Sequence, residues 1–273
     1  MPRLTWRPER SRLPPPTEPR LVDGLHVLAA APGRGIVEVG GVLDLRPVCP
    51  PIDNQFSISD CVADSTTAAL ELLEVAAGLP FAKKSRLFLY YNARLQTQET
   101  DRDEGTYIRL AFASLTTLGT CTEATWPYDA SQVFIRPSWR AYREAFPNKI
   151  SSFYRIDSDG SERVDQVQRA LRAQHPVVFG MTVDRDYMGT GSDGVVAMPR
   201  SNRQDAGGHA QVIVGYDDHD RWIVRNSWGV GWGDGGYGYV PYGYLDASGA
   251  DDLWVPYRAP TVVDSTTVTV TRG

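Results

Sequence analysis

The stretch RWIVRNSWGVGWGDGGYGY, residues 221–239, decides the fold of this chain. It begins with a short apolar run that is typical of a β-strand and continues into glycines and aromatic residues, which indicate tight turns. Asn226 stands where the strand ends. The preceding segment GGHAQVIVGYDD, residues 207–218, places His209 after two glycines and at the start of another apolar strand. If these two strands pair, Asn226 can hydrogen-bond one imidazole nitrogen of His209 and hold the ring.

A cysteine lies far upstream at the start of a predicted helix, in NQFSISDCVADSTTAALELLE, residues 54–74. Apolar residues recur there at helical spacing, so we expect a helix from about Asp60 to Ala77. A helix N-terminus lowers the pKa of a thiol through its dipole and unpaired N–H groups. Taken alone, Cys61 is more typical of a small buried residue. The His and Asn downstream favour a nucleophile, because partners about 130–150 residues after a Cys are a known arrangement.

The other segments predict an α+β fold in which strands follow helices. Such segregation favours two lobes with a cleft between them. The expected helices are residues 85–96, 106–119, 138–146 and 164–174; a short strand lies within 42–51, and longer ones at 176–183, 210–218, 221–228 and 237–242. Residues 262–273 have β propensity without a further motif.

The composition is that of an ordinary globular protein. The 273 residues are 42% apolar and 22% charged, and the net charge is −5. This charge argues against nucleic acid or an anionic membrane surface as the main partner. No apolar run approaches the about 18–20 residues of a membrane span, and no secretory signal follows the N-terminus. We therefore expect a cytoplasmic protein with neither a nucleic-acid nor a membrane partner.

The three cysteines do not form a disulfide scaffold, and their odd number leaves at least one of them free. No C-x-x-C pair occurs and the four histidines are scattered, which argues against a structural zinc site. We expect no metal and no cofactor. Residues 1–40 are rich in Arg and Pro and predict an arm outside the core, for which a disordered or surface-draped tail is the commoner state.

Several motifs together resemble the papain-like cysteine peptidases, particularly their microbial branch. They are NQFSISDC, DEGTYI, WPYD, GGHAQVIVGYDD and NSWGVGWGDGGYGY, in this order between about Leu43 and Val255. The resemblance implies a papain-like two-lobe fold, a helical lobe plus a β-barrel-like lobe with the active-site cleft between them. It divides a single catalytic domain into an N-terminal arm at 1–40, a helical lobe at 41–145, a β lobe at 146–258 and a tail at 259–273.

The resemblance also implies roles for individual residues. Cys61 would be the nucleophile, His209 its proton partner and Asn226 the residue that orients His209. Gln55 would join the Cys61 backbone N–H in an oxyanion hole, a kind of donor that contributes a few kcal/mol to catalysis. The substrate would be bound by Gly105, Thr106, Tyr107, Ile108, Gly207, Gly208 and Ala210, with Trp228, which would also shield the Asn226 hydrogen bond, and Trp232 on the leaving-group side.

The loop before Cys61 departs from the family pattern. Phe56 replaces a glycine, and Ser59-Asp60 replace Gly-Ser. A carboxylate at Asp60 would disfavour the thiolate, but we expect it to cap the helix and face solvent. Ile58 replaces the cysteine of the family's common disulfide. The resemblance allows Cys49 and Cys121 to pair instead, although in a reducing cytosol both would be thiols.

Three functions remain open at this point. The leading one is a thiol peptidase that hydrolyses peptide or protein substrates through an acyl-enzyme. The second is an amide-forming or acyl-transfer enzyme of the same fold, suggested by the altered loop around Phe56 and Asp60. The third is a catalytically silent relative that binds an extended peptide. For all three, residues 1–40 are the candidate for a short pro-segment that inhibits the protein from within the same chain.

Overall fold

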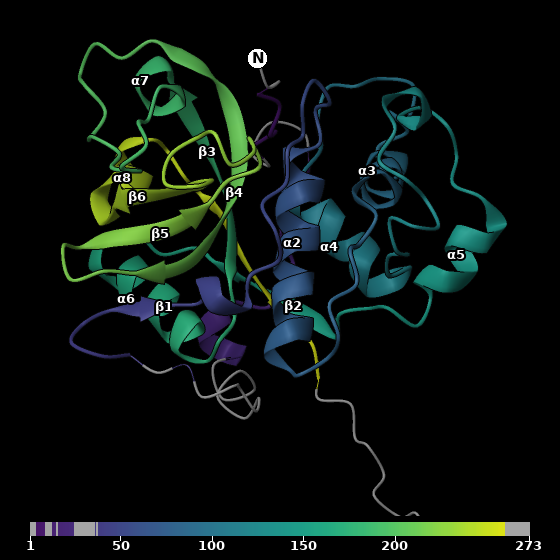
Figure 1. Ribbon diagram of the computed structural model, residues 1–273, viewed down its shortest axis with the longest axis horizontal. Coiled ribbons are helices and arrows are strands. Elements are labelled where there is room, and N and C mark those ends of the chain that lie inside the picture. Colours follow the sequence, from purple (N-terminus) through teal and green to yellow (C-terminus); the bar gives the residue numbers. More distant parts are fainter. Residues whose placement is uncertain (1–3, 9–12, 15, 25–35, 37, 260–273) are drawn as a thin grey trace, which may run out of the picture.

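The computed structural model describes residues 4–8, 13–14, 16–24, 36 and 38–259. The helices are α2 (Cys61–Ala76), α3 (Arg86–Leu95), α4 (Ile108–Thr117), α5 (Trp139–Ala145), α6 (Gly160–Arg172), α7 (Arg185–Met188) and α8 (Tyr242–Ala247), with the 3-10 helices η2 (Arg46–Val48) and η3 (Ala130–Gln132). The strands are β1 (Leu43–Asp44), β2 (Ser152–Ile156), β3 (Val177–Asp184), β4 (Asp205–Tyr216), β5 (Arg221–Arg225), β6 (Tyr237–Pro241) and β7 (Asp252–Tyr257). Helices α2 to α5 lie on one side of the molecule and most of the sheet on the other (Figure 1).

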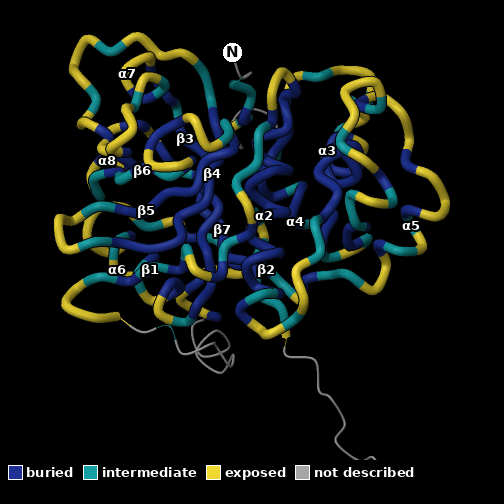
Figure 2. Tube along the Cα trace, in the orientation of Figure 1, coloured by how far each residue is buried: buried dark blue, intermediate teal, exposed yellow. Residues whose placement is uncertain are grey.

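Helix α2 is the central element and packs against β4, α3 and α4. Nearly all of its residues are buried, and in Figure 2 it lies in the middle of the molecule. The hydroxyls of Thr66 and Thr67 donate to the carbonyls of Val62 and Ala63, at 2.6 and 2.8 Å. These bonds satisfy polar groups that the helix carries into the core.

The sheet is antiparallel throughout, in the order β2-β7-β3-β4-β5-β6, with β1 on β4. Strand β4 pairs with β3 on one side, where His209 faces Met181, and with β5 on the other. Among the described strands, β2 and β6 end the order and do not pair with each other. The expected β-barrel-like lobe is therefore an open, curved arrangement rather than a closed barrel.

The helices and strands predicted from periodicity are present. The expected helix at about 60–77 is α2, and the apolar runs of the second half form β3, β4, β5 and β6. Strands β2 and β7 were not predicted, nor were the short helices α7 and α8. Residues 262–273, for which β propensity was noted, lie outside the described residues.

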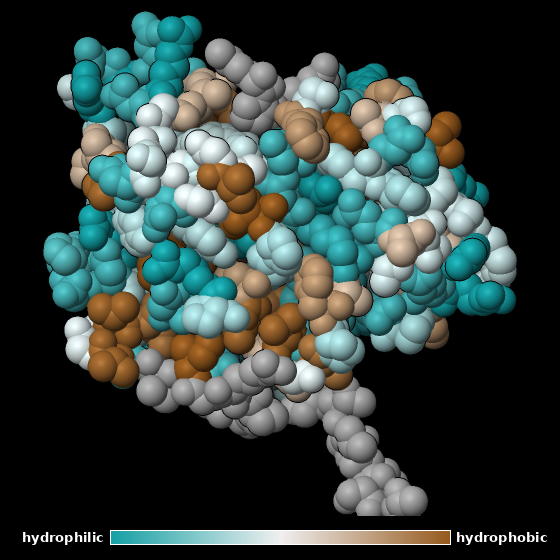
Figure 3. Space-filling model, in the orientation of Figure 1, coloured by the Kyte–Doolittle hydropathy of each residue, from teal (hydrophilic) through white to brown (hydrophobic). Residues whose placement is uncertain are grey.

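Hydrophilic and hydrophobic side chains are unevenly distributed over the face of the molecule that Figure 3 shows. Figure 3 shows mostly hydrophilic side chains over the α3 to α5 side, and hydrophobic ones nearer the sheet. None of the described helices is both long and apolar enough to cross a bilayer.

Candidate active site

Cys61 is the first residue of α2 and is completely buried. The backbone N–H groups of Ala210 and Thr5 approach its sulfur and favour the thiolate. Burial outweighs them and raises the pKa of the Cys61 thiol to about 12. The expected lowering by the helix N-terminus is therefore not the dominant effect in this state, in which part of the N-terminal arm covers the sulfur.

His209 and Asn226 come together because β4 and β5 pair, with Val212 opposite Arg225. His209 Nε2 lies 2.8 Å from Asn226 Oδ1, which also accepts the Ser227 N–H at 2.8 Å. Since this oxygen only accepts, Nε2 carries the imidazole proton and Nδ1 presents a lone pair. Nδ1 is buried and has no hydrogen-bond partner among the described residues.

The environment of His209 is apolar. Its ring stacks on Trp228 at 4.4 Å between centroids and 22° between planes. Burial lowers the pKa of His209 to about 4, against the opposing effect of the Asn226 hydrogen bond. The N–H of the next residue, Ala210, approaches the thiol, so the structure places Cys61 against the strand that carries His209. Within the described part of the chain, no hydrogen bond joins the thiol to the His209 imidazole.

Gln55 is buried in the loop that precedes α2. Its Nε2 donates to the Ile58 carbonyl at 3.1 Å, and its Oε1 accepts the Ser227 hydroxyl at 2.9 Å. The Gln55 N–H also donates to the Ser227 carbonyl at 2.9 Å. Gln55 is thus tied to the residue that follows Asn226, which joins the two halves of the site.

The predicted substrate-binding glycines surround residues of the N-terminal arm. The Trp6 N–H donates to the Gly208 carbonyl at 3.1 Å, and the Arg7 N–H donates to the Thr106 carbonyl at 3.4 Å. Gly105 has φ +82°, and a Cβ there would lie 1.6 Å from the Thr5 carbonyl oxygen. Only glycine allows the arm to approach this closely.

Of the aromatic residues predicted to bind substrate, Trp228 and Trp232 pack against each other, whereas Tyr107 contacts the N-terminal arm. Trp232 packs edge-on against Trp228 at 5.6 Å, and its Nε1 donates to the Tyr187 carbonyl at 3.3 Å. Tyr107 and Ile108 are buried at the start of α4. The Arg7 guanidinium lies over the Tyr107 ring, 5.9 Å from its centroid.

Phe56, Ser59 and Asp60, which depart from the family pattern, differ in their exposure and in their contacts. Phe56 is 64% exposed and has φ +48°, the left-handed conformation that a glycine adopts readily. Ser59 is buried and its hydroxyl donates to the Asp103 carbonyl at 2.9 Å. The expectation that Asp60 caps the helix and faces solvent is wrong: Asp60 is buried and makes no side-chain capping bond. It is held instead by Tyr128, whose hydroxyl lies 3.0 Å from Asp60 Oδ1.

The three cysteines are free thiols, so the pairing of Cys49 with Cys121 does not occur in the structure. Cys49 lies near Arg225 and Tyr237, whereas Cys121 lies near Ser85 and Glu144. Burial raises the pKa of Cys49 to about 11.

Three residues beside the site were not singled out from the sequence: Trp6, Tyr128 and Asp252. Trp6 belongs to the arm, and its Nε1 donates to Asp252 Oδ2 at 2.9 Å. Asp252 Oδ1 also accepts from Trp254 Nε1. The WPYD motif contains Tyr128, but no sequence signal connects Trp6 with a residue so far along the chain.

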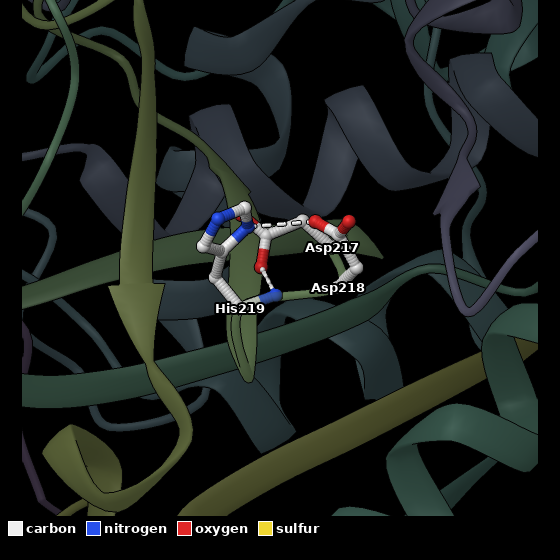
Figure 4. Close-up of side chains that lie close together, drawn as sticks. All are labelled: Asp217, Asp218 and His219. Atoms are coloured by element: carbon white, nitrogen blue, oxygen red, sulfur yellow. Dashed lines mark hydrogen bonds and ion pairs between the residues drawn. The ribbon is translucent and has the colours of Figure 1, made fainter.

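One cluster of potential metal ligands occurs among the described residues, Asp217, Asp218 and His219. Figure 4 shows that all three come from the single turn after β4. Asp217 already accepts the His219 N–H at 2.9 Å and pairs with Arg221 at 2.7 Å. These contacts explain why the three side chains lie close together: they belong to one turn, and Asp217 also forms an ion pair.

Comparison with known proteins identifies the class to which this site belongs. The family model described as "Papain family cysteine protease" matches residues 43–251. The chain therefore belongs to the papain family of cysteine proteases. The fold and the site agree with this class, since Cys61 begins a buried helix, His209 lies on β4 and Asn226 directly follows β5.

The relatives come from viruses, bacteria and animals. An uncharacterized peptidase C1-like protein of Acanthamoeba polyphaga mimivirus is 34% identical over 230 residues, which cover 81% of this chain and 74% of that protein. A cysteine protease of Blomia tropicalis is 26% identical, covering 71% of this chain but only 58% of its own length. Among solved structures, xylellain, a cysteine protease from Xylella fastidiosa, is 28% identical with a TM-score of 0.78 and covers 94% of this chain and 96% of its own. Digestive procathepsin L 3 of Tenebrio molitor, at 19% identity with a TM-score of 0.60, covering 87% of this chain and 79% of its own, shares the fold.

Proposed function

We propose that this protein is a thiol peptidase that hydrolyses peptide bonds through an acyl-enzyme on Cys61. The observation that carries the proposal is the 2.8 Å bond between His209 Nε2 and Asn226 Oδ1. This bond fixes the tautomer in which Nδ1 carries a lone pair, and that lone pair serves as the base toward Cys61. Buried nucleophile, base and orienting amide are all present, which argues against a catalytically silent relative.

The chemistry follows from these roles. The Cys61 proton passes to His209 Nδ1, and the sulfur attacks the peptide carbonyl carbon. The Cys61 N–H and Gln55 Nε2 stabilise the oxyanion that forms. The C–N bond then breaks, and the amine leaves with the proton from His209. Water, deprotonated by His209, attacks the thioester, and the carboxylic acid product and the free thiol result.

The test combines thiol labelling with peptide turnover. Iodoacetamide should label Cys61 and abolish hydrolysis, and Cys61→Ala should lower turnover by at least about 10⁴-fold, since the reaction loses its covalent step. Cys121→Ala is the matched control and should retain turnover. Hydrolysis that survives in Cys61→Ala would refute the proposal. An amide product formed only when an amine is added would instead indicate acyl transfer.

We further propose that the N-terminal arm inhibits the site from within the same chain. The support is contact with the residues expected to bind substrate: Thr5 pairs with Gly208 in parallel, and Arg7 bonds to Thr106. The start of the described chain lies between β4 and α2 in Figure 1. A peptide in this position excludes substrate and keeps both Cys61 and His209 buried.

Side chains anchor the arm on both sides of the site. Arg7 pairs with Glu99 at 2.6 Å and with Glu104 at 3.1 Å. Further along, Glu18 pairs with Arg109 at 3.4 Å. A surface ion pair alone is worth at most about 1 kcal/mol, so the buried Trp6 is the stronger anchor.

The direction of the arm explains why it is not itself an obvious substrate. It runs from Thr5 at Cys61 to Arg7 at Thr106, away from the nucleophile. The family resemblance implies that substrate residues before the cut lie on the Thr106 side. A substrate therefore runs toward Cys61, opposite to the arm.

A further inference from the structure

Asp60 precedes the nucleophile directly, and its carboxyl group is completely buried. Its Oδ1 lies 3.0 Å from the Tyr128 hydroxyl. Its Oδ2 is buried and has no hydrogen-bond partner within the described part of the chain. An ionised carboxylate normally accepts several hydrogen bonds, so an oxygen without a donor is costly here.

The hydrogen bonds of Tyr128 determine which groups can carry protons. Its hydroxyl lies 3.0 Å from Asp60 Oδ1 and also 3.0 Å from the Gln55 carbonyl oxygen. A phenol has one proton to donate, and the Gln55 carbonyl can only accept. Both contacts are full hydrogen bonds only if Asp60 donates to Tyr128 and Tyr128 donates to Gln55. The geometry therefore favours a proton on Asp60.

The nearby charges agree with a neutral Asp60. The groups that face it are Asp64, Asp103, Arg86, Arg94 and the Cys61 thiol. Both cations have other partners: Arg86 Nη1 donates to Asp64 Oδ1 at 2.9 Å, and the Arg94 guanidinium donates to the carbonyls of Arg102 and Val133. The Arg86 guanidinium also lies over the Tyr128 ring, 3.5 Å from its centroid. Burial, with the charge of Asp64, raises the pKa of Asp60 well above its usual range.

We propose that Asp60 is a neutral carboxylic acid and that the chain Asp60–Tyr128–Gln55 positions the oxyanion-binding loop before Cys61. The proposal rests on the peptidase function above and assigns two positioning residues to it. It also answers the difficulty raised by the sequence, because a neutral acid puts no negative charge beside the thiolate.

The first experiment replaces the acid by its neutral isostere. Asn in Asp60→Asn can donate an N–H to Tyr128, as the acid does. The pH dependence of Cys61 alkylation by iodoacetamide is measured in the full chain, with and without Trp6→Ala to open the site. We expect the apparent thiol pKa to stay within about 0.3 units of the wild-type value. If Asp60 were ionised, removing its charge would lower that pKa by about 1 unit or more, which would overturn the proposal.

The second experiment removes the hydroxyl of Tyr128, the middle member of the hydrogen-bond chain Asp60–Tyr128–Gln55. Tyr128→Phe removes the donor to Gln55 and the acceptor for Asp60, so we expect kcat to fall about 10-fold with KM unchanged within about 2-fold. Adding Asp60→Asn to Tyr128→Phe should cause no further loss, because both substitutions act through one chain. Tyr142→Phe is the matched control, since Tyr142 donates to Asn92 Oδ1 at 2.8 Å in the same lobe.

The two experiments separate the failure of this proposal from that of the peptidase function. A normal kcat in Tyr128→Phe, or an equal loss in Tyr142→Phe, would contradict the positioning role. If the protein opened by Trp6→Ala also hydrolyses no peptide, the peptidase function is refuted, whereas the alkylation profile of Asp60→Asn would still decide the protonation of Asp60.

Discussion

Phe56 illustrates what a single residue contributes to the site. The residue holds φ +48° directly after Gln55, and its N–H donates to Asn54 Oδ1 at 2.8 Å, which stabilises the turn. Glycine adopts this conformation without steric cost, whereas a residue with a Cβ is strained by about 1 kcal/mol or more. The strain is therefore retained in the loop that carries the proposed oxyanion donor.

Phe56→Gly should raise the free energy of unfolding by about 1 kcal/mol, because it removes this strain and little buried surface. Urea denaturation measures the change. Phe146→Gly is the matched control: Phe146 is 66% exposed, similar to Phe56, but has a helical φ of −53°. There glycine should lower stability by about 0.5–1 kcal/mol. Equal destabilisation by both substitutions would show that Phe56 is not strained.

The junction between α6 and β3 contains a buried histidine, whose protonation makes the stability of the protein depend on pH. His175 is buried there, and its Nδ1 lies 3.0 Å from the Pro256 carbonyl in β7. Burial lowers the pKa of His175 to about 4. An unfolded chain takes up the proton near pH 6.5, so the unfolded state binds more protons between these values. The stability contributed by neutral His175 is therefore complete above about pH 6.5 and is lost as pH falls toward 4.

His175→Gln should remove this part of the acid sensitivity. The difference in unfolding free energy between wild type and variant should shrink by up to about 3 kcal/mol from pH 7 to pH 4. Urea midpoints at several pH values measure it. A difference that stays constant with pH for His175→Gln would contradict the burial argument.

The whole molecule brings the arm, the helices and the sheet into one site. Trp6 is the contact common to them: it is buried, its Nε1 bonds to Asp252, and its ring fills the space above Gly180. A Cβ at Gly180 would lie 2.1 Å from that ring. The arm is therefore seated in a pocket that glycine keeps open.

Trp6→Ala should release the arm, because truncating a buried tryptophan costs about 3–5 kcal/mol. We expect the rate of Cys61 alkylation by iodoacetamide to rise at least about 10-fold, and peptide turnover to rise with it. Trp139→Ala removes a tryptophan that is 78% exposed and should change neither rate. If removing residues 1–40 also leaves both rates unchanged, the arm is not an inhibitor.

Local sequence predicted much of this architecture. Apolar periodicity is a property of a short segment, so α2 and the strands carrying His209 and Asn226 could be recognised without a structure. Strands β2 and β7 could not, because SFYRI mixes polar and apolar residues and DLWVPY contains a proline. Each becomes a strand through its partner, with Phe153 opposite Pro256.

The sequence by itself determined the papain-family class, the candidate nucleophile and the residues proposed to serve it, because spacing and local pattern carry these. The tertiary structure decided the state of the site. Asp60 is buried rather than solvent-facing because Tyr128 reaches it from 68 residues away. Trp6 fills its pocket because Asp252, 246 residues along the chain, accepts its N–H. Contacts over such separations depend on how whole elements pack, which no local pattern encodes.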